Sequence, residues 1–153
     1  MDRLFRPHNI IWIKNVNTVT EDAYMNLAGN SFRLYFPRKH KTNAGSPQEG
    51  EIILLFQNIG LQKVFTHLVN PTDNLPAQED KTRKRHEFYR NVKIVAMAPL
   101  AELIVVSKTM WKDVNFQGIG QGNAYKIKNV SNISSNHDEL LEYVWNKFSH
   151  FLR

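Results

Sequence analysis

The sequence predicts an α+β fold in which about six to seven short strands form a small, strongly bent β-barrel with flanking helices. Three observations favour this class. Short segments rich in β-branched and aromatic residues recur along the chain, and helical periodicity is confined to two segments near its ends. Strands and helices also fail to alternate as a doubly wound parallel sheet requires. At 153 residues, we expect one domain that spans residues 1–153.

The predicted strands differ in how their apolar residues are spaced. Residues 32–36 alternate, with Phe32, Leu34 and Phe36 on one face and Arg33 and Tyr35 on the other. Residues 51–57 are almost entirely apolar, which is typical of a strand buried on both faces. Further strands are expected over residues 8–14, 62–69, 92–97, 103–106 and 123–130, with a hairpin turn at 58–60 and a long polar loop at 70–87.

Two segments have the features of helices. Residues 20–28 begin with a threonine that can cap the helix, have acidic residues in the first turn and are followed by Gly29. Residues 135–152 place apolar side chains at helical spacing, which predicts an amphipathic C-terminal helix. Its apolar stripe consists of Leu140, Leu141, Val144, Trp145, Phe148, Phe151 and Leu152.

Composition narrows the function classes. The chain has 20 Lys and Arg against 14 Asp and Glu, a net charge of +6 that favours a polyanionic partner. The absence of cysteine excludes disulfides, cysteine zinc sites and thiol catalysis. No apolar run approaches the ~20 residues of a membrane helix, and the first residues lack the apolar stretch of a signal peptide. We therefore expect a cytoplasmic protein with no membrane partner.

No motif of a known catalytic chemistry is present. The six histidines are scattered without metal-ligand spacing, and the glycines at 118, 120 and 122 lack the Gly-Lys-Ser/Thr ending of a phosphate loop. Catalytic residues, metal ligands and cofactors are therefore predicted to be absent. One enzymatic alternative stays open, a metal-dependent hydrolase or nuclease with ligands drawn from His67, Asp113 and Glu51.

Two basic segments are the strongest functional signal. Residues 32–48 contain no carboxylate, and residues 81–93 contain only Glu87 among six lysines and arginines, including Arg90 and Lys93. Such segments can neutralise phosphates, while the interleaved Tyr35, Phe36, Phe88 and Tyr89 can stack on bases. The other interpretation is a solvated basic loop beside core aromatics. The predicted phosphate-binding residues are Arg33, Arg38, Lys39, Lys41, Arg83, Lys84 and Arg85.

The tryptophans separate into two groups. Trp145 belongs to the apolar stripe of the C-terminal helix and is predicted to be core. Trp12 lies in the middle of a predicted strand, and Trp111 lies in an irregular polar region. Exposure of a tryptophan ring in such places is unfavourable, so each either packs at the barrel mouth or forms a wall of an aromatic pocket.

The order of elements resembles that of the PUA-like superfamily, which includes the PUA, ASCH, EVE and YTH domains. Here a strand ending in Ile-Lys-Asn-Val-Asn at residues 13–17 runs into a capped helix. A basic segment, Gly50-Glu51 and the hydrophobic residues 52–56 come next, followed by the strand at 63–69. The resemblance covers roughly residues 8–130 and is greatest for the EVE and YTH branch.

The resemblance implies a bent barrel that binds RNA or DNA, often with a modified base in an aromatic pocket. Lys14, Asn15 and Asn17 match the positions after the first strand that line this pocket, and Trp111 is a candidate aromatic wall. The tryptophan that YTH domains have between the first helix and the next strand is missing. Phe32, Tyr35 and Phe36 are the aromatic residues there, so specificity for methylated adenine is not implied.

The sequence thus predicts a non-catalytic domain that binds nucleic acid, RNA or DNA, by reading a flipped or modified base. Amides such as those of Asn15 and Asn17 pair well with base edges. A protein-interaction module and the metal-dependent enzyme are the alternatives, and the oligomeric state is open. The predicted base-pocket residues are Trp12, Lys14, Asn15, Asn17, Tyr35 and Trp111.

Overall fold

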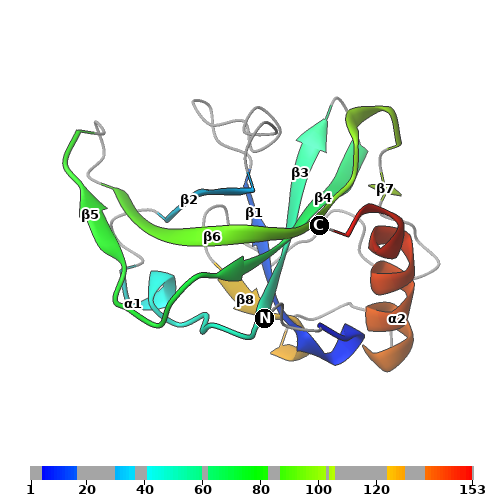
Figure 1. The fold of residues 1–153 in the computed structure, drawn as a ribbon, viewed down its shortest axis with the longest axis horizontal. Helices are drawn as coiled ribbons and strands as arrows, with labels where there is room; N and C mark the ends of the chain where they lie inside the picture. The colour runs from blue at the N-terminus through cyan, green and yellow to red at the C-terminus, as the bar shows by residue number, and fades with distance from the viewer. Residues whose placement is uncertain are drawn as a thin grey trace.

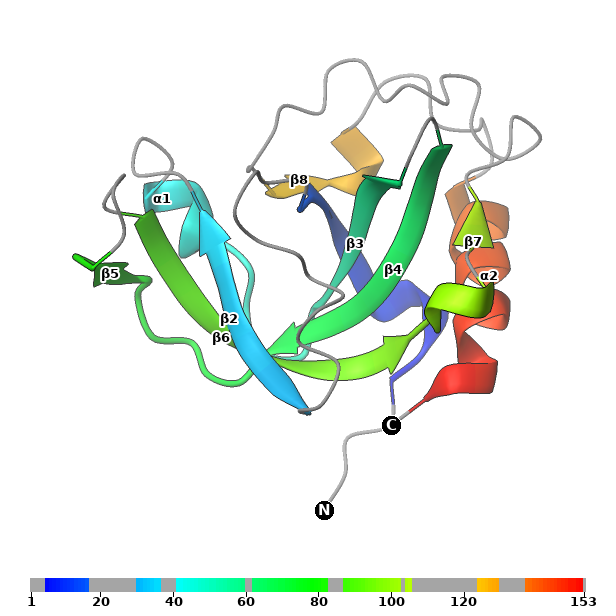
Figure 2. The ribbon, with the colours of Figure 1, turned by 90° about the horizontal axis from the view of Figure 1, so that it is seen from above.

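A computed structural model describes residues 5–16, 30–36, 41–59, 62–82, 87–102, 104–105, 124–129 and 137–152. These residues form one eight-stranded sheet that curls into a half-barrel, with a helix beside it (Figures 1 and 2). The strands are β1 (Ile10–Asn15), β2 (Ser31–Phe36), β3 (Ile52–Ile59), β4 (Gln62–Pro71), β5 (Gln78–Asp80), β6 (Glu87–Met97), β7 (Ile104–Val105) and β8 (Ala124–Lys126). The helices are α1 (Lys41–Ala44) and α2 (His137–Phe148), with short 3-10 turns η1 (Pro7–Asn9), η4 (Leu100–Glu102), η5 (Ile127–Asn129) and η6 (Ser149–Phe151).

The sheet has the order β2-β6-β4-β3-β1-β8, and two short strands extend it: β5 pairs with β6, and β7 pairs with β4. The pairing of β1 with β3 is parallel, whereas the other pairs are antiparallel. Figure 2 shows β6 running beneath the half-barrel from the side of β2 to the side of α2. This long strand joins the two arms of the curl.

Two apolar cores lie on opposite faces of this sheet. The outer core lies between the sheet and α2, and it includes Leu54, Phe56 and Phe65 from the strands. The inner core fills the hollow of the half-barrel, and it includes Ile53, Leu55 and Val69. Because successive residues of a strand point to opposite faces, β3 contributes to both cores. The prediction that this segment is buried on both faces is confirmed, since residues 52–57 are all buried.

The alternation predicted for residues 32–36 is also confirmed. Leu34 and Phe36 are buried in the inner core and Phe32 packs against it, whereas Arg33 is exposed. The C-terminal helix is confirmed as well, although α2 begins at His137 and its last turn gives way to η6. Asp138 and Glu139 occupy its first turn, where acidic side chains stabilise the helix by interacting with the positive end of its dipole. Leu140, Leu141, Val144 and Phe148 of the predicted apolar stripe are buried in the outer core, and Trp145 is partly buried against it. The end of the stripe differs from the prediction, because Leu152 is 51% exposed.

The structure corrects several predicted boundaries. The predicted loop at 70–87 contains the end of β4, the whole of β5 and the start of β6, because backbone pairing with the long β6 outweighs local polarity. The segment at 123–130 is only partly strand, since η5 follows β8 after Lys126. Strand β4 begins at Gln62 as predicted, whereas β3 extends to Ile59, so residues 58 and 59 belong to a strand and not to the predicted turn. Helix α1 was not predicted, and the predicted helix at 20–28 lies outside the described residues.

None of the described helices has the length and apolar character that crossing a membrane requires.

Candidate functional site

An aromatic and cationic cluster lies on the outer face of β2 and β6. The guanidinium carbon of Arg33 is 4.4 Å from the centroid of the Tyr89 ring. Tyr35 and Tyr89 are directly paired across the two strands, with ring centroids 5.8 Å apart and planes inclined by 55°. The side chain of Arg33 is 54% exposed, so solvent reaches this cluster. We refer to Arg33, Tyr35 and Tyr89 as the Tyr–Arg platform.

Asp80 of β5 holds the platform in place. The Tyr35 hydroxyl donates to Asp80 Oδ2 at 2.8 Å, and Arg33 Nη1 lies 3.7 Å from the same oxygen. The backbone amide and hydroxyl of Thr82 donate to Asp80 Oδ1. The hydrogen bonds from Thr82 and Tyr35, with the charge of Arg33, lower the pKa of Asp80 below its ordinary value. The carboxylate is therefore ionised at neutral pH and orients both Tyr35 and Arg33.

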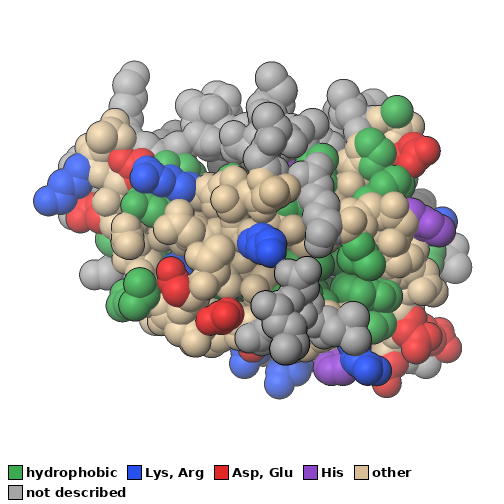
Figure 3. Space-filling model, in the orientation of Figure 1, with side chains coloured by type: hydrophobic (Ala, Val, Ile, Leu, Met, Phe, Trp, Pro, Cys, Tyr) green, Lys and Arg blue, Asp and Glu red, His purple; other side chains and the backbone are tan. Residues whose placement is uncertain are grey.

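The second platform tyrosine is fixed separately. The Tyr89 hydroxyl donates to Gln78 Oε1 at 2.7 Å, and Gln78 pairs with Tyr89 between β5 and β6. Both tyrosine rings are thus tied at their hydroxyl ends to β5. Figure 3 shows basic and acidic side chains gathered at the end of the molecule where β5 lies.

Polar side chains also occupy the inner face of the half-barrel. Lys14 and His67 both pair with Leu55, so they flank it from β1 and β4 on the same face. Lys14 is 1% exposed, and its Nζ lies 3.5 Å from the backbone oxygen of Asn15. His67 Nδ1 is 2.8 Å from Thr66 Oγ1. The centroids of the His67 and Phe32 rings are 5.7 Å apart in an edge-to-face arrangement.

Burial changes the protonation of Lys14. Desolvation lowers its pKa from 10.5 to about 7, and the charge of Glu87 opposes this shift only in part. Unlike a lysine on the surface, this amine therefore loses its proton readily near neutral pH. This property makes Lys14 unsuited to permanent neutralisation of an external phosphate.

The structure separates the predicted base-pocket residues. Trp12 is 6% exposed within the inner core, and its Nε1 donates to Glu51 Oε1 at 3.0 Å. Trp12 and Lys14 lie on the inner face, whereas Tyr35 lies on the outer face of β2 with the platform. These three side chains therefore do not line one pocket. Asn15 is half-buried at the end of β1.

Among the other predicted site residues, Lys41 is the first residue of α1. The remaining ones lie outside the described residues: Asn17 and Trp111 of the predicted base pocket, and Arg38, Lys39, Arg83, Lys84 and Arg85 of the predicted phosphate-binding segments. Of the phosphate-binding set, the structure therefore describes the side chain of Arg33 alone.

The structure corrects the interpretation of Arg90, which was counted in the basic segment at 81–93. It is 3% exposed, and its guanidinium donates to the backbone oxygens of Ala44, Pro47 and Asp73 at 2.8–3.0 Å. Burial lowers its pKa from the ordinary value, partly opposed by the charge of Asp73. Its place on β6 puts it on the inner face with Phe88, where it links the end of α1 and Pro47 to Asp73 rather than facing a phosphate.

The residues of the metal-dependent alternative are not gathered in the part of the chain that the structure describes. There, no group of three or more His, Cys, Asp or Glu side chains could hold a metal ion. His67 is buried beside Thr66, and Glu51 accepts a hydrogen bond from the indole nitrogen of Trp12. Asp113 lies outside the described residues.

Sequence reasoning noted Tyr89 but did not select it, and it overlooked Asp80. The signal for Tyr89 was the alternation of Phe88 and Tyr89 at the start of β6, which sends the second ring to the wet face. Asp80 had no such signal, because its role depends on the pairing of β5 with β6. No model of a known family, no curated protein and no solved structure matches this chain.

Proposed function

We propose that this chain is a non-catalytic nucleic-acid-binding domain whose Tyr–Arg platform stacks on an unpaired base. The observation that carries the proposal is the exposed Arg33 guanidinium, held 4.4 Å over the Tyr89 ring with Tyr35 beside it. Aromatic rings and arginine planes are the surfaces on which single-stranded nucleic acids stack their bases. The Asp80 and Gln78 hydrogen bonds pre-order these groups, which reduces the entropy lost on binding.

The basic segments adjoin the platform in the chain. Phe36 at the end of β2 pairs with Phe88, and Asp80 at the end of β5 pairs with Glu87. The described residues that flank residues 37–40 and 83–86 therefore meet at one end of the sheet. This arrangement supports a path for phosphates along Arg38, Lys39, Arg83, Lys84 and Arg85, each contact releasing counterions.

The fold supports the resemblance to PUA-like domains at the level of a small curled sheet with a C-terminal helix. In the proposal, the chain belongs to that class and binds RNA or DNA, including modified strands. The inner face differs from the expected base pocket, since Trp12 and Lys14 are covered. The proposed stacking surface is therefore the outer platform.

The test is fluorescence anisotropy with short single-stranded RNA and DNA, modified and unmodified, at two salt concentrations. We expect salt-dependent binding by the unaltered protein. Stacking contributes about 1–3 kcal/mol per base, so we expect Arg33→Gln with Tyr89→Leu to weaken binding by roughly 5- to 150-fold. The control Lys147→Gln removes an exposed charge on α2 and is expected to bind normally.

Two outcomes would refute the proposal. One is the absence of binding to every strand at low salt. The other is binding that survives the platform substitutions unchanged. Capture of a protein partner that is insensitive to salt, with no nucleic acid bound, would favour the protein-interaction module instead.

A further inference from the structure

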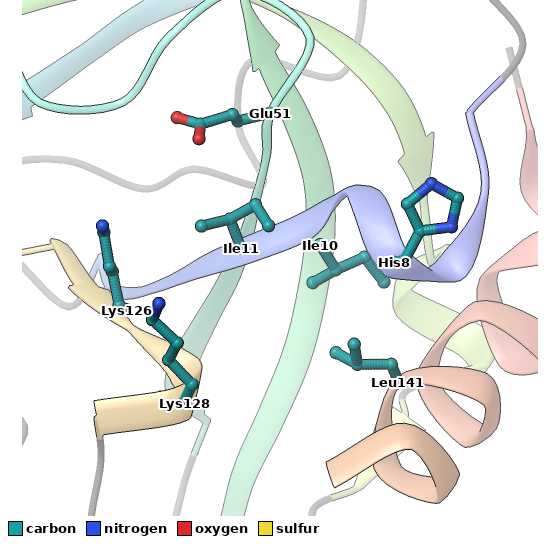
Figure 4. Close-up of a pocket in the computed structure, with 7 residues that line it drawn as sticks. All are labelled: His8, Ile10, Ile11, Glu51, Lys126, Lys128 and Leu141. Carbon is teal, nitrogen blue, oxygen red and sulfur yellow. The ribbon is translucent and has the colours of Figure 1, made fainter.

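A groove of about 240 Å³ lies at the β8 edge of the sheet, opposite the edge formed by β2 (Figure 4). Lys126 of β8 and Lys128 of η5 lie at one end, and His8 of η1 lies at the other. Ile10 and Ile11 of β1 lie between these ends. The groove therefore has a cationic end and an apolar middle, and it contains no residue of the Tyr–Arg platform.

The two lysines form the cationic end. Both are exposed, and Figure 4 shows their side chains extending in the same direction, toward the side of β1 where Ile11 and Glu51 lie. Lys126 Nζ is also 5.6 Å from the centroid of the Trp12 ring, a cation–π contact that restricts its side chain. Two amines directed into one space favour an anion with more than one negative charge.

The apolar middle is created by an irregularity in β1. The register of β1 against β3 shifts between Ile10 and Trp12, which leaves Ile11 as an extra residue. Such bulges redirect a side chain and recur beside functional sites. The pairing of β8 with β1 covers only Trp12 to Lys14, so Ile10 and Ile11 lie beyond the end of β8. Ile10 and Leu141 of α2 are buried at the base of the groove, so the half-buried Ile11 supplies the accessible apolar surface.

Glu51 adds a fixed acceptor near the lysine end. Its Oε1 accepts hydrogen bonds from Trp12 Nε1 at 3.0 Å and from the backbone amide of Gln48 at 2.8 Å. The carboxylate is thereby held in one orientation at the groove wall. A carboxylate there disfavours a bare anion placed next to it, but it suits a hydroxyl group that donates a hydrogen bond.

We infer that this groove binds a phosphate monoester of a sugar or nucleoside. The phosphate, close to a dianion at neutral pH, lies between Lys126 and Lys128. A sugar hydroxyl donates to Glu51, and the remaining body of the ligand covers the half-buried Ile11 toward His8. The same chemistry occurs in a free nucleotide and at the 5′-phosphorylated end of a strand.

The experiment is a calorimetric titration of the whole chain with AMP, adenosine and inorganic phosphate as separate probes. We expect AMP to bind, with adenosine and phosphate at least about tenfold weaker, because each lacks one half of the contacts. Lys126→Gln with Lys128→Gln should weaken the binding of AMP by about tenfold or more. The matched control, Lys93→Gln with Lys147→Gln, removes two exposed lysines elsewhere and should bind AMP within about twofold of the unaltered protein.

A second arm identifies the source of the phosphate. A short strand with a 5′-phosphate is compared with the same strand bearing a 5′-hydroxyl, in the Arg33→Gln, Tyr89→Leu background that lacks the platform. Preference for the phosphorylated end indicates a strand terminus, whereas binding of AMP alone indicates a free nucleotide. Failure of both AMP and the phosphorylated strand to bind overturns the inference, as does unchanged affinity of the groove variant. Either failure leaves the platform proposal to be judged by its own variants.

Discussion

The side-chain nitrogen of Lys14 lies 4.8 Å from the centroid of the Phe36 ring, although β3, β4 and β6 separate their strands in the sheet. Lys14 belongs to β1 and Phe36 to β2, and both side chains are almost completely buried. The contact therefore spans the hollow of the half-barrel. It shows how tightly the sheet curls, and it places a titratable amine in an apolar interior.

Lys14 makes stability depend on pH. Its pKa is about 7 in the folded chain and near the ordinary 10.5 when unfolded, so the unfolded chain binds more protons between these values. The free energy of unfolding should then rise with pH from about 7 to about 10, by at most roughly 1.4 kcal/mol per unit from this group. Lys14→Met should remove that slope and stabilise the protein at pH 7. Urea unfolding at pH 7, 8 and 9 measures it.

Lys147→Met, on the exposed face of α2, is the control and should retain the slope of the unaltered protein. Equal slopes in the Lys14 and Lys147 variants would show that the amine of Lys14 is not desolvated in the folded chain.

Arg90 should be a major contributor to stability. Its guanidinium donates to three backbone oxygens, of which those of Ala44 and Pro47 are buried and that of Asp73 is partly buried, so Arg90→Met would leave these acceptors without their donor. We expect a loss of about 2–4 kcal/mol in the free energy of unfolding. Arg33→Met on the neighbouring β2 removes an exposed guanidinium and should cost much less stability than Arg90→Met. Similar losses for both variants, measured by urea denaturation, would contradict this assignment.

Asp80 should titrate below its ordinary value of 3.8, because hydrogen bonds from Thr82 and Tyr35 favour its charged form. A lowered pKa in the folded state means that this stabilisation is present above pH 4 and is lost as the pH falls through the folded pKa. The carboxyl resonance of Asp80, followed by NMR, gives the midpoint. Tyr35→Phe should raise it and Tyr143→Phe should not. A midpoint at or above 3.8 in the unaltered protein would exclude this network.

Two predictions concern residues outside the described structure. If Trp111 forms an aromatic wall, Trp111→Ala should abolish preference among bases while leaving the salt dependence of binding intact. Lys84→Ala with Arg85→Ala should weaken binding to all sequences and flatten the salt slope, because fewer counterions are released. Anisotropy with base-varied strands measures both. If Trp111→Ala has no effect on affinity or preference, Trp111 is not part of the binding site.

The accuracy of the sequence predictions followed the range of the interactions involved. Alternation placed Arg33 and Tyr35 on the wet face of β2 correctly, since the side-chain period of a strand is local. The same rule would have found Arg90, which shares one face of β6 with Phe88 and Val92. Arg90 was instead grouped with its basic neighbours because of its charge, so its position on the buried face was not recognised. Neither Asp80 nor the groove could be found this way, because each depends on which strands become neighbours.

By itself, the sequence determined the β-rich class, the amphipathic C-terminal helix and the faces of the alternating strands, since these follow from the spacing of apolar residues along the chain. Only the tertiary structure decided that Trp12 and Tyr35 face opposite sides of the sheet and that Lys126 and Lys128 border one groove with Ile11. The physical reason is that strand order, register shifts and curl arise from contacts between distant segments. Residue spacing alone does not specify those contacts.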